Sequence, residues 1–374
     1  MRAFSCTCGQ PLFFDNLRCL SCGAEVAYDP TATMLSAIAP AGDGLWSVAA
    51  DPRAPAPRFR LCSHRTAAAA CNWMVPAERP EGICLSCRLT RTIPALDRPK
   101  NADRLRELEA AKRRVLFALQ NLELPLVPRS DDPERGLAFD FLESLPDEAR
   151  VLTGHASGII TLNVAEADDD YREKNREHLN EPYRTIIGHL RHELGHYYWD
   201  VLINGGVWLP RFRELFGDER ADYGQALQKH YADGPPPDWA TRHISSYAAS
   251  HPWEDWAESW AHFMHARATL ETVKSFGIGT DATTLKVTPF TADVLYRQDS
   301  EGNGERFLGW INAWVVLTAV LNETARSMGQ PDIYPFVLNR QVVTKLHFIQ
   351  CVIMDRAISA APEEIPPQLA VPQA

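Results

Sequence analysis

The chain has 374 residues, of which 45% are hydrophobic and 23% charged, an ordinary composition for a globular protein. No run approaches the roughly 18 consecutive apolar residues of a membrane span, and the first residues lack the apolar core of a secretory signal. We therefore expect a cytoplasmic protein without a membrane partner. The net charge of −10 argues against a nucleic-acid partner, because phosphate contacts need a basic face.

Eight of the nine cysteines fall before residue 88. Without a secretory signal, such a cluster is more typical of zinc thiolates than of disulfides. The first four lie in two tight pairs around a short apolar hairpin and suit one tetrahedral structural zinc. These are Cys6, Cys8, Cys19 and Cys22.

The second quartet, which follows a proline-rich connector at residues 51–57, is spaced more loosely. It comprises Cys62, Cys71, Cys84 and Cys87, and only its last pair has the two-residue spacing of a zinc knuckle. We assign it a second structural zinc. His64 in place of one thiolate, or pairing between the quartets, remains open. Residues 1–100 carry eleven Lys and Arg against eight Asp and Glu, and we expect this region to be able to bind a protein partner.

The pattern of apolar residues predicts a helix over residues 101–122, which opens a second domain. Residues 137–145 and 150–164 read as strands, and we expect 159–164 to be a sheet edge that pairs with an extended peptide substrate. The acidic run at residues 166–170 lacks the spacing of a calcium loop, so we expect a solvated loop there.

A helix with Pro182 near its first turn is predicted next, and it carries the pattern H-E-x-x-H at residues 192–196. Positions i and i+4 share one face of a helix, so His192 and His196 can bind one zinc ion. Glu193 then lies beside the metal, where a general base for a zinc-activated water is needed.

A catalytic zinc usually takes three protein ligands and leaves one position open. The extended metzincin pattern requires glycine at 199 and histidine at 202, and Trp199 and Leu202 exclude it. The third ligand must then come from elsewhere in the chain.

The segment from residue 251 to 262 is the stronger source, because Pro252 can start a helix on which Glu254 and Glu258 share one face. We assign the metal to Glu254 and assign Glu258 to a hydrogen bond with a ligand histidine. Glu258, Asp255 and His251 remain alternative ligands. Amphipathic helices over residues 305–328 and 335–358 complete the domain.

The cysteine-rich front and the segments 183–200 and 251–258 resemble a bacterial family of zinc-binding metallopeptidases with an N-terminal zinc ribbon. The catalytic half is similar to gluzincins of the anthrax lethal-factor type, whose E-x-x-A-E segment corresponds to residues 254–258. The resemblance implies that Glu254 is the zinc ligand. It also implies that Tyr247, seven residues earlier, stabilises the oxyanion.

We expect an α+β chain with a small β zinc-ribbon region at residues 1–100. A mainly helical, zincin-like metallopeptidase domain with a small sheet follows at 101–361, and 362–374 form a disordered Pro-rich tail. The predicted function is zinc-dependent hydrolysis of a peptide or protein substrate, with one catalytic and two structural zinc ions. The alternative is a zinc-ribbon adaptor with a catalytically silent scaffold. Glu193 argues against this alternative, because a scaffold needs no general base.

Overall fold

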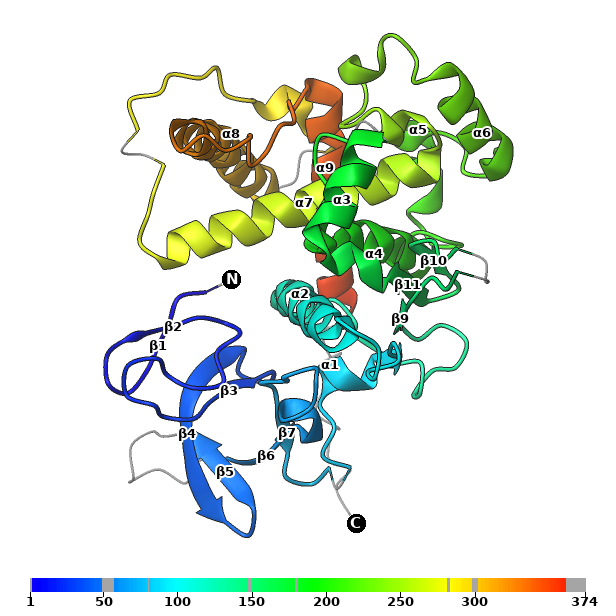
Figure 1. Ribbon diagram of the computed structural model, residues 1–374. Helices are drawn as coiled ribbons and strands as arrows, with labels where there is room; N and C mark the ends of the chain where they lie inside the picture. The colour runs from blue at the N-terminus through cyan, green and yellow to red at the C-terminus, as the bar shows by residue number, and fades with distance from the viewer. Residues whose placement is uncertain are drawn as a thin grey trace, which may run out of the picture.

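The computed structural model describes residues 2–48, 57–79, 81–146, 150–178, 181–280, 283–297 and 302–360. The strand-rich N-terminal region lies at one end of the molecule and the long helices at the other, with α2 (Asn101–Asn121) between them (Figure 1). This arrangement confirms the predicted α+β class. The proline-rich connector, apart from residue 57, and the tail from 362 lie outside the described residues.

Two antiparallel sheets form the N-terminal region. The first pairs β1 (Phe4–Ser5) with β2 (Pro11–Leu12). The second has the order β3 (Val26–Asp29), β4 (Met34–Gly42), β5 (Leu45–Val48), β6 (Arg58–Leu61) and β7 (Met74–Pro76). An isolated bridge between Tyr28 and Trp73 brings the first and last strands together.

An aromatic core joins this region to α2. Tyr28 and Trp73 have ring centroids 4.9 Å apart, and Phe14 lies 5.2 Å from both Tyr28 and Phe117. Phe117 comes from α2 and is fully buried. The N-terminal region and α2 therefore share one hydrophobic core. Its buried aromatic side chains contribute much of the stability of that core.

A third sheet lies beside the long helices and has the order β10 (Gly154–Ala156), β11 (Ile159–Asn163), β9 (Ala138–Leu142) and β8 (Thr90–Thr92). Strand β11 is parallel to β9 and antiparallel to β10, so it is paired on both sides. The expectation that residues 159–164 form the sheet edge is therefore wrong. The edge strand next to β11 is β10, a three-residue strand whose glycine and alanine carry little strand signal.

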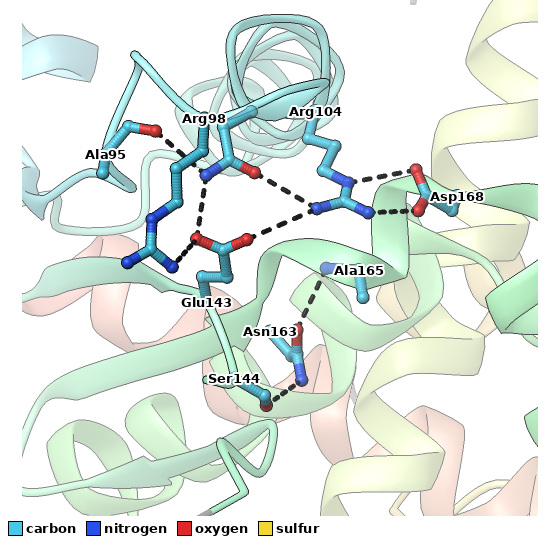
Figure 2. Close-up of polar contacts among 9 residues, drawn as sticks. Ala95, Arg98, Arg104, Glu143, Ser144, Asn163, Ala165 and Asp168 are labelled. Atoms are coloured by element: carbon cyan, nitrogen blue, oxygen red, sulfur yellow. Dashed lines mark hydrogen bonds and ion pairs between the residues drawn. The ribbon is translucent and has the colours of Figure 1, made fainter. Parts of the chain in front are cut away.

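Strand β8 lies before residue 100 and yet pairs with β9 of the helical region. The short helix α1 (Leu85–Arg88) leads directly into it. Polar contacts hold the segment between β8 and the first turn of α2 in place (Figure 2). Glu143 accepts hydrogen bonds from Arg98 and Asn101, each at 3.0 Å. One turn further along α2, Arg104 forms a bidentate pair with Asp168 at 3.1 and 2.5 Å. The join between the two regions is thus tied by charge-assisted hydrogen bonds.

The remaining long elements are helices. They are α3 (Asp169–His178), α4 (Ile186–Leu202), α5 (Leu209–Phe216), α6 (Tyr223–Asp233), α7 (Pro252–Ser275), α8 (Asn303–Ser327) and α9 (Arg340–Ala360). Helices α4 and α7 pack against each other at the centre of this region (Figure 1). Among the described residues, no helix is both long and apolar enough to cross a membrane.

Two local expectations are corrected. Helix α4 begins at Ile186 and not near Pro182, because Thr185 caps it by accepting a hydrogen bond from the Gly188 amide at 2.9 Å. The acidic run is mostly helical and not a loop, and its solvated part is Asp169 and Asp170 in the first turn of α3. Glu166 is 2% exposed and forms an ion pair with Arg184 at 2.5 Å, and residues Val164–Ala167 form the 3₁₀ helix η2.

Candidate metal centre

The close approach of α4 and α7 determines the geometry of the site. A Cβ atom on Gly195 would lie 2.8 Å from Cα of Ala257, nearer than real contacts allow. The Trp256 indole donates a hydrogen bond to the Gly195 carbonyl at 2.8 Å, which fixes the same contact. The glycine inside the H-E-x-x-H pattern therefore lets the second helix reach the two histidines.

Three potential ligand groups meet where these helices cross. His192, His196 and Glu254 each offer a ligand atom, and these atoms all lie within 4.8 Å of one another. Nε2 of His192 lies 3.0 Å from Oε2 of Glu254, and Nε2 of His196 lies 3.5 Å from Oε1. Two ligands on a tetrahedral zinc lie about 3.3 Å apart, given bond lengths of about 2.0–2.1 Å.

The chemistry of this group also fits zinc. Glu254 is 1% exposed, and its Oε2 atom has no hydrogen-bond partner among the described residues. A buried carboxylate needs a partner, and a divalent cation between the two imidazoles and Oε2 supplies one. Two histidines and one glutamate leave a fourth position open, as in catalytic zinc sites.

Glu258 lies one turn after Glu254 and contacts His192 from the other side. Its Oε1 atom is 2.8 Å from Nδ1 of His192, and its Oε2 atom accepts a hydrogen bond from Ser245 at 2.6 Å. This leaves Nε2 of His192 directed at Glu254. Such a carboxylate partner fixes the tautomer and orientation of a ligand histidine.

The other two alternative ligands are engaged elsewhere. Asp255 forms a buried ion pair with Lys345 at 2.5 Å, and burial raises its pKa to about 7 although Lys345 opposes that shift. His251 caps α7, since its Nδ1 atom accepts a hydrogen bond from the Trp253 amide at 3.1 Å. Neither residue belongs to the cluster of potential metal ligands among the described residues.

Glu193 and Tyr247 both lie at this centre. Glu193 follows His192 on α4 and is 8% exposed; burial raises its pKa, while the charges of His192 and His196 oppose the shift. The ring of Tyr247 lies 6.0 Å from that of His192. Tyr247 lies in the 3₁₀ helix η4 (Tyr247–Ala249), just before α7. The structure therefore brings every residue predicted for the catalytic centre into one place.

Two further residues at this centre were missed by sequence reasoning. The hydroxyl of Tyr223, in the first turn of α6, donates a hydrogen bond to Oε1 of Glu254 at 2.7 Å. His155, on the edge strand β10, has its ring 6.3 Å from that of His196, and burial together with the charge of His196 lowers its pKa to about 4. Neither belongs to a local motif. The one signal near Tyr223 is Asp222, which predicts a helix start and no contact with residue 254.

The cysteines form two separate clusters, as the sequence predicts, and each cluster has its sulfur atoms within 4.8 Å. Contacts within the first are 3.6 Å for Cys6 with Cys22 and 3.8 Å for Cys8 with Cys19. Four thiolates on one zinc lie about 3.8 Å apart, given bonds of about 2.3 Å. Backbone amides of Cys22 and Ser21 lower the pKa of Cys19 to about 6, which favours the thiolate that metals bind.

The second cluster has the same dimensions, with Cys62 and Cys87 3.7 Å apart and Cys71 and Cys84 3.5 Å apart. All four of its cysteines are buried, and His64 does not belong to this group of potential metal ligands. The two quartets therefore do not exchange ligands, and each can hold one metal ion.

Comparison with known proteins agrees with this arrangement. The family described as "Putative zinc-binding metallo-peptidase" matches residues 101–352, and a zinc-ribbon domain family matches residues 3–98. Uncharacterized proteins of Mycobacterium tuberculosis and Mycobacterium bovis are 41% identical over 356 residues, which cover 94% of this chain and 95% of the relatives. No solved structure matches the chain. The chain thus belongs to the family of zinc-binding metallopeptidases and carries an N-terminal zinc-ribbon domain.

Proposed function

We propose that the protein is a gluzincin-like zinc peptidase that hydrolyses peptide bonds in a peptide or protein substrate. The observation that carries the proposal is the cluster of His192, His196 and Glu254, with the carboxylate of Glu193 on the adjacent position of the same helix. When bound there, zinc supplies a Lewis acid that polarises the scissile carbonyl and makes water acidic enough to attack near neutral pH.

Three residues of the chain then have different roles in the reaction. Glu193 takes the proton of the attacking water and delivers it to the leaving amine. Tyr247 donates a hydrogen bond to the negative oxygen that develops on the substrate, a contact typically worth about 3 kcal/mol. Glu258 orients His192.

We further propose that an extended substrate pairs with β10. This strand is the sheet edge nearest the metal centre, and its His155 ring lies 6.3 Å from that of His196. Addition of a peptide strand to such an edge supplies backbone hydrogen bonds without requiring one sequence.

The two family matches meet between residues 98 and 101, which supports a domain boundary near residue 100.

The substitution Glu193→Gln tests the mechanism. It removes the base and keeps the shape of the side chain, so we expect peptide cleavage to fall by about 10²–10⁴-fold while zinc content stays unchanged. The measurement is cleavage of a mixed peptide library by the full-length chain, with metal analysis of the same samples.

Glu214→Gln is the matched control, because Glu214 is an exposed residue of α5 that pairs only with Arg211 in the described contacts. Equal cleavage by wild type and Glu193→Gln would overturn the mechanism. Absence of cleavage by the zinc-loaded wild type would favour the adaptor instead.

A further inference from the structure

The two carboxylate oxygens of Glu254 have different surroundings. Oε1 accepts the hydrogen bond from Tyr223 at 2.7 Å and lies 3.5 Å from Nε2 of His196. Oε2 lies 3.0 Å from Nε2 of His192 and has no hydrogen-bond partner in the described part of the chain. One oxygen is therefore held by the protein, and the other is left for a different partner.

Tyr223 is itself held in place by the start of α7. Its ring packs edge-on against His251 at 5.3 Å and Trp253 at 5.7 Å. The same His251 lies 3.1 Å from the carbonyl of Ala221 through its Nε2 atom. Asp222 caps α6 by accepting a hydrogen bond from the Gln225 amide at 2.9 Å. The phenol is thus held on one side by His251 and Trp253, which precede Glu254, and on the other by the start of α6 at Asp222.

A hydrogen bond to one oxygen restricts how a carboxylate can bind a metal ion. It sets the plane of the carboxylate and occupies a lone pair that a second metal bond would need. Metal-binding carboxylates in proteins are commonly hydrogen-bonded in this way, and loss of such a partner typically costs about 10–100-fold in metal affinity. A phenol, with an ordinary pKa of about 10, remains a donor at neutral pH.

We propose that Tyr223 is a positioning residue whose hydroxyl holds Oε1 of Glu254 so that Oε2 faces the metal ion between the two histidines. The inference rests on the metal site proposed above. It assigns to α6 a part in that site which no local motif indicates. Tyr223 and Tyr247 then have different tasks: Tyr223 orients a ligand, and Tyr247 faces the substrate.

Zinc affinity of the full-length Tyr223→Phe variant tests this inference. The third site is emptied with a mild chelator and titrated with zinc against a competing indicator, while the cysteine sites stay loaded. A variant with both His192→Ala and His196→Ala gives the background from the cysteine sites. We expect affinity about 10–100-fold weaker than in wild type.

Tyr171→Phe is the matched control. Tyr171 lies on α3, and in the described contacts its hydroxyl accepts a hydrogen bond only from Arg150. We expect its zinc affinity to equal that of wild type. Tyr223→Phe should also shift the absorption bands of a cobalt ion bound at the third site, because these bands report ligand geometry. A melting temperature equal to that of wild type shows that the fold is retained.

Wild-type zinc affinity and an unchanged cobalt spectrum in Tyr223→Phe would overturn the positioning role. If wild type itself binds no zinc beyond that of the double histidine variant, the proposed metal site fails instead. The two failures are therefore distinguishable.

Discussion

The cysteine clusters and the His192, His196 and Glu254 cluster hold their ligand atoms within the same 4.8 Å, yet they are built differently. Each cysteine cluster presents four sulfur atoms, which complete a tetrahedron, and its ligands come from turns and short elements of the N-terminal region. The third cluster presents three ligands from two packed helices and leaves one position free. A closed set suits a structural metal ion, and an open set suits a catalytic one.

The surroundings of the clusters differ in the same sense. The third cluster has the carboxylate of Glu193 on the next position of α4. Two tyrosines also lie near it: Tyr223 donates a hydrogen bond to Glu254, and the ring of Tyr247 lies 6.0 Å from that of His192. The second cysteine cluster is wholly buried, and Cys87 is followed within three residues by β8, a strand of the sheet that ends at β10. The comparison supports the proposal that the cysteine clusters maintain the fold and that the third cluster is the catalytic site.

Metal removal gives the largest expected difference between the clusters. A mild chelator should remove about one zinc ion per chain, abolish cleavage and leave the melting temperature nearly unchanged, because three ligands and an open position release metal more readily than four thiolates. Metal analysis, cleavage and thermal unfolding of the same sample check this. If the chain unfolds when the first zinc ion is removed, the distinction between a catalytic and a structural metal site fails.

Cysteine substitutions should separate the two quartets. Cys71→Ser affects a fully buried site, and we expect it to lower the free energy of unfolding by more than about 4 kcal/mol, the range typical of losing a structural metal. Cys8→Ser should cost about 1–2 kcal/mol, because Cys8 is exposed and water can take its place. Denaturant unfolding of both variants measures the difference. Equal losses of unfolding free energy in the two variants would show that burial of the cysteine does not determine how much each site stabilises the fold.

A change at the helix crossing beside the third cluster should affect stability less than loss of the buried cysteine site. Gly195→Ala places a methyl group against Cα of Ala257, so we expect a loss of about 1–3 kcal/mol together with weaker zinc binding as α7 moves away. Gly309→Ala is the matched control, since a Cβ there meets nothing within 4 Å and alanine favours a helix interior by about 1 kcal/mol. Thermal unfolding and zinc titration check both. A stable Gly195→Ala variant with normal zinc binding would contradict the packing argument.

Local patterns in the sequence account for the α+β class, the two cysteine quartets and the helices that carry His192 and Glu254. Each depends on spacing along the chain: the knuckles of the quartets, the i and i+4 positions of H-E-x-x-H, and Pro252 at a helix start. The same patterns placed the start of α4 a few residues early, because the Thr185 cap competes with Pro182 as a helix signal.

Other features depend on which segments meet in space, and no spacing encodes those meetings. The sequence by itself determined which side chains can bind metal and which elements carry them. Only the tertiary structure decided that β10 is an edge of the sheet, that β8 joins the sheet of the helical region and that Tyr223 contacts Glu254. The physical reason is that strand order and contacts between distant helices follow from packing of the whole core, to which each short segment contributes little signal.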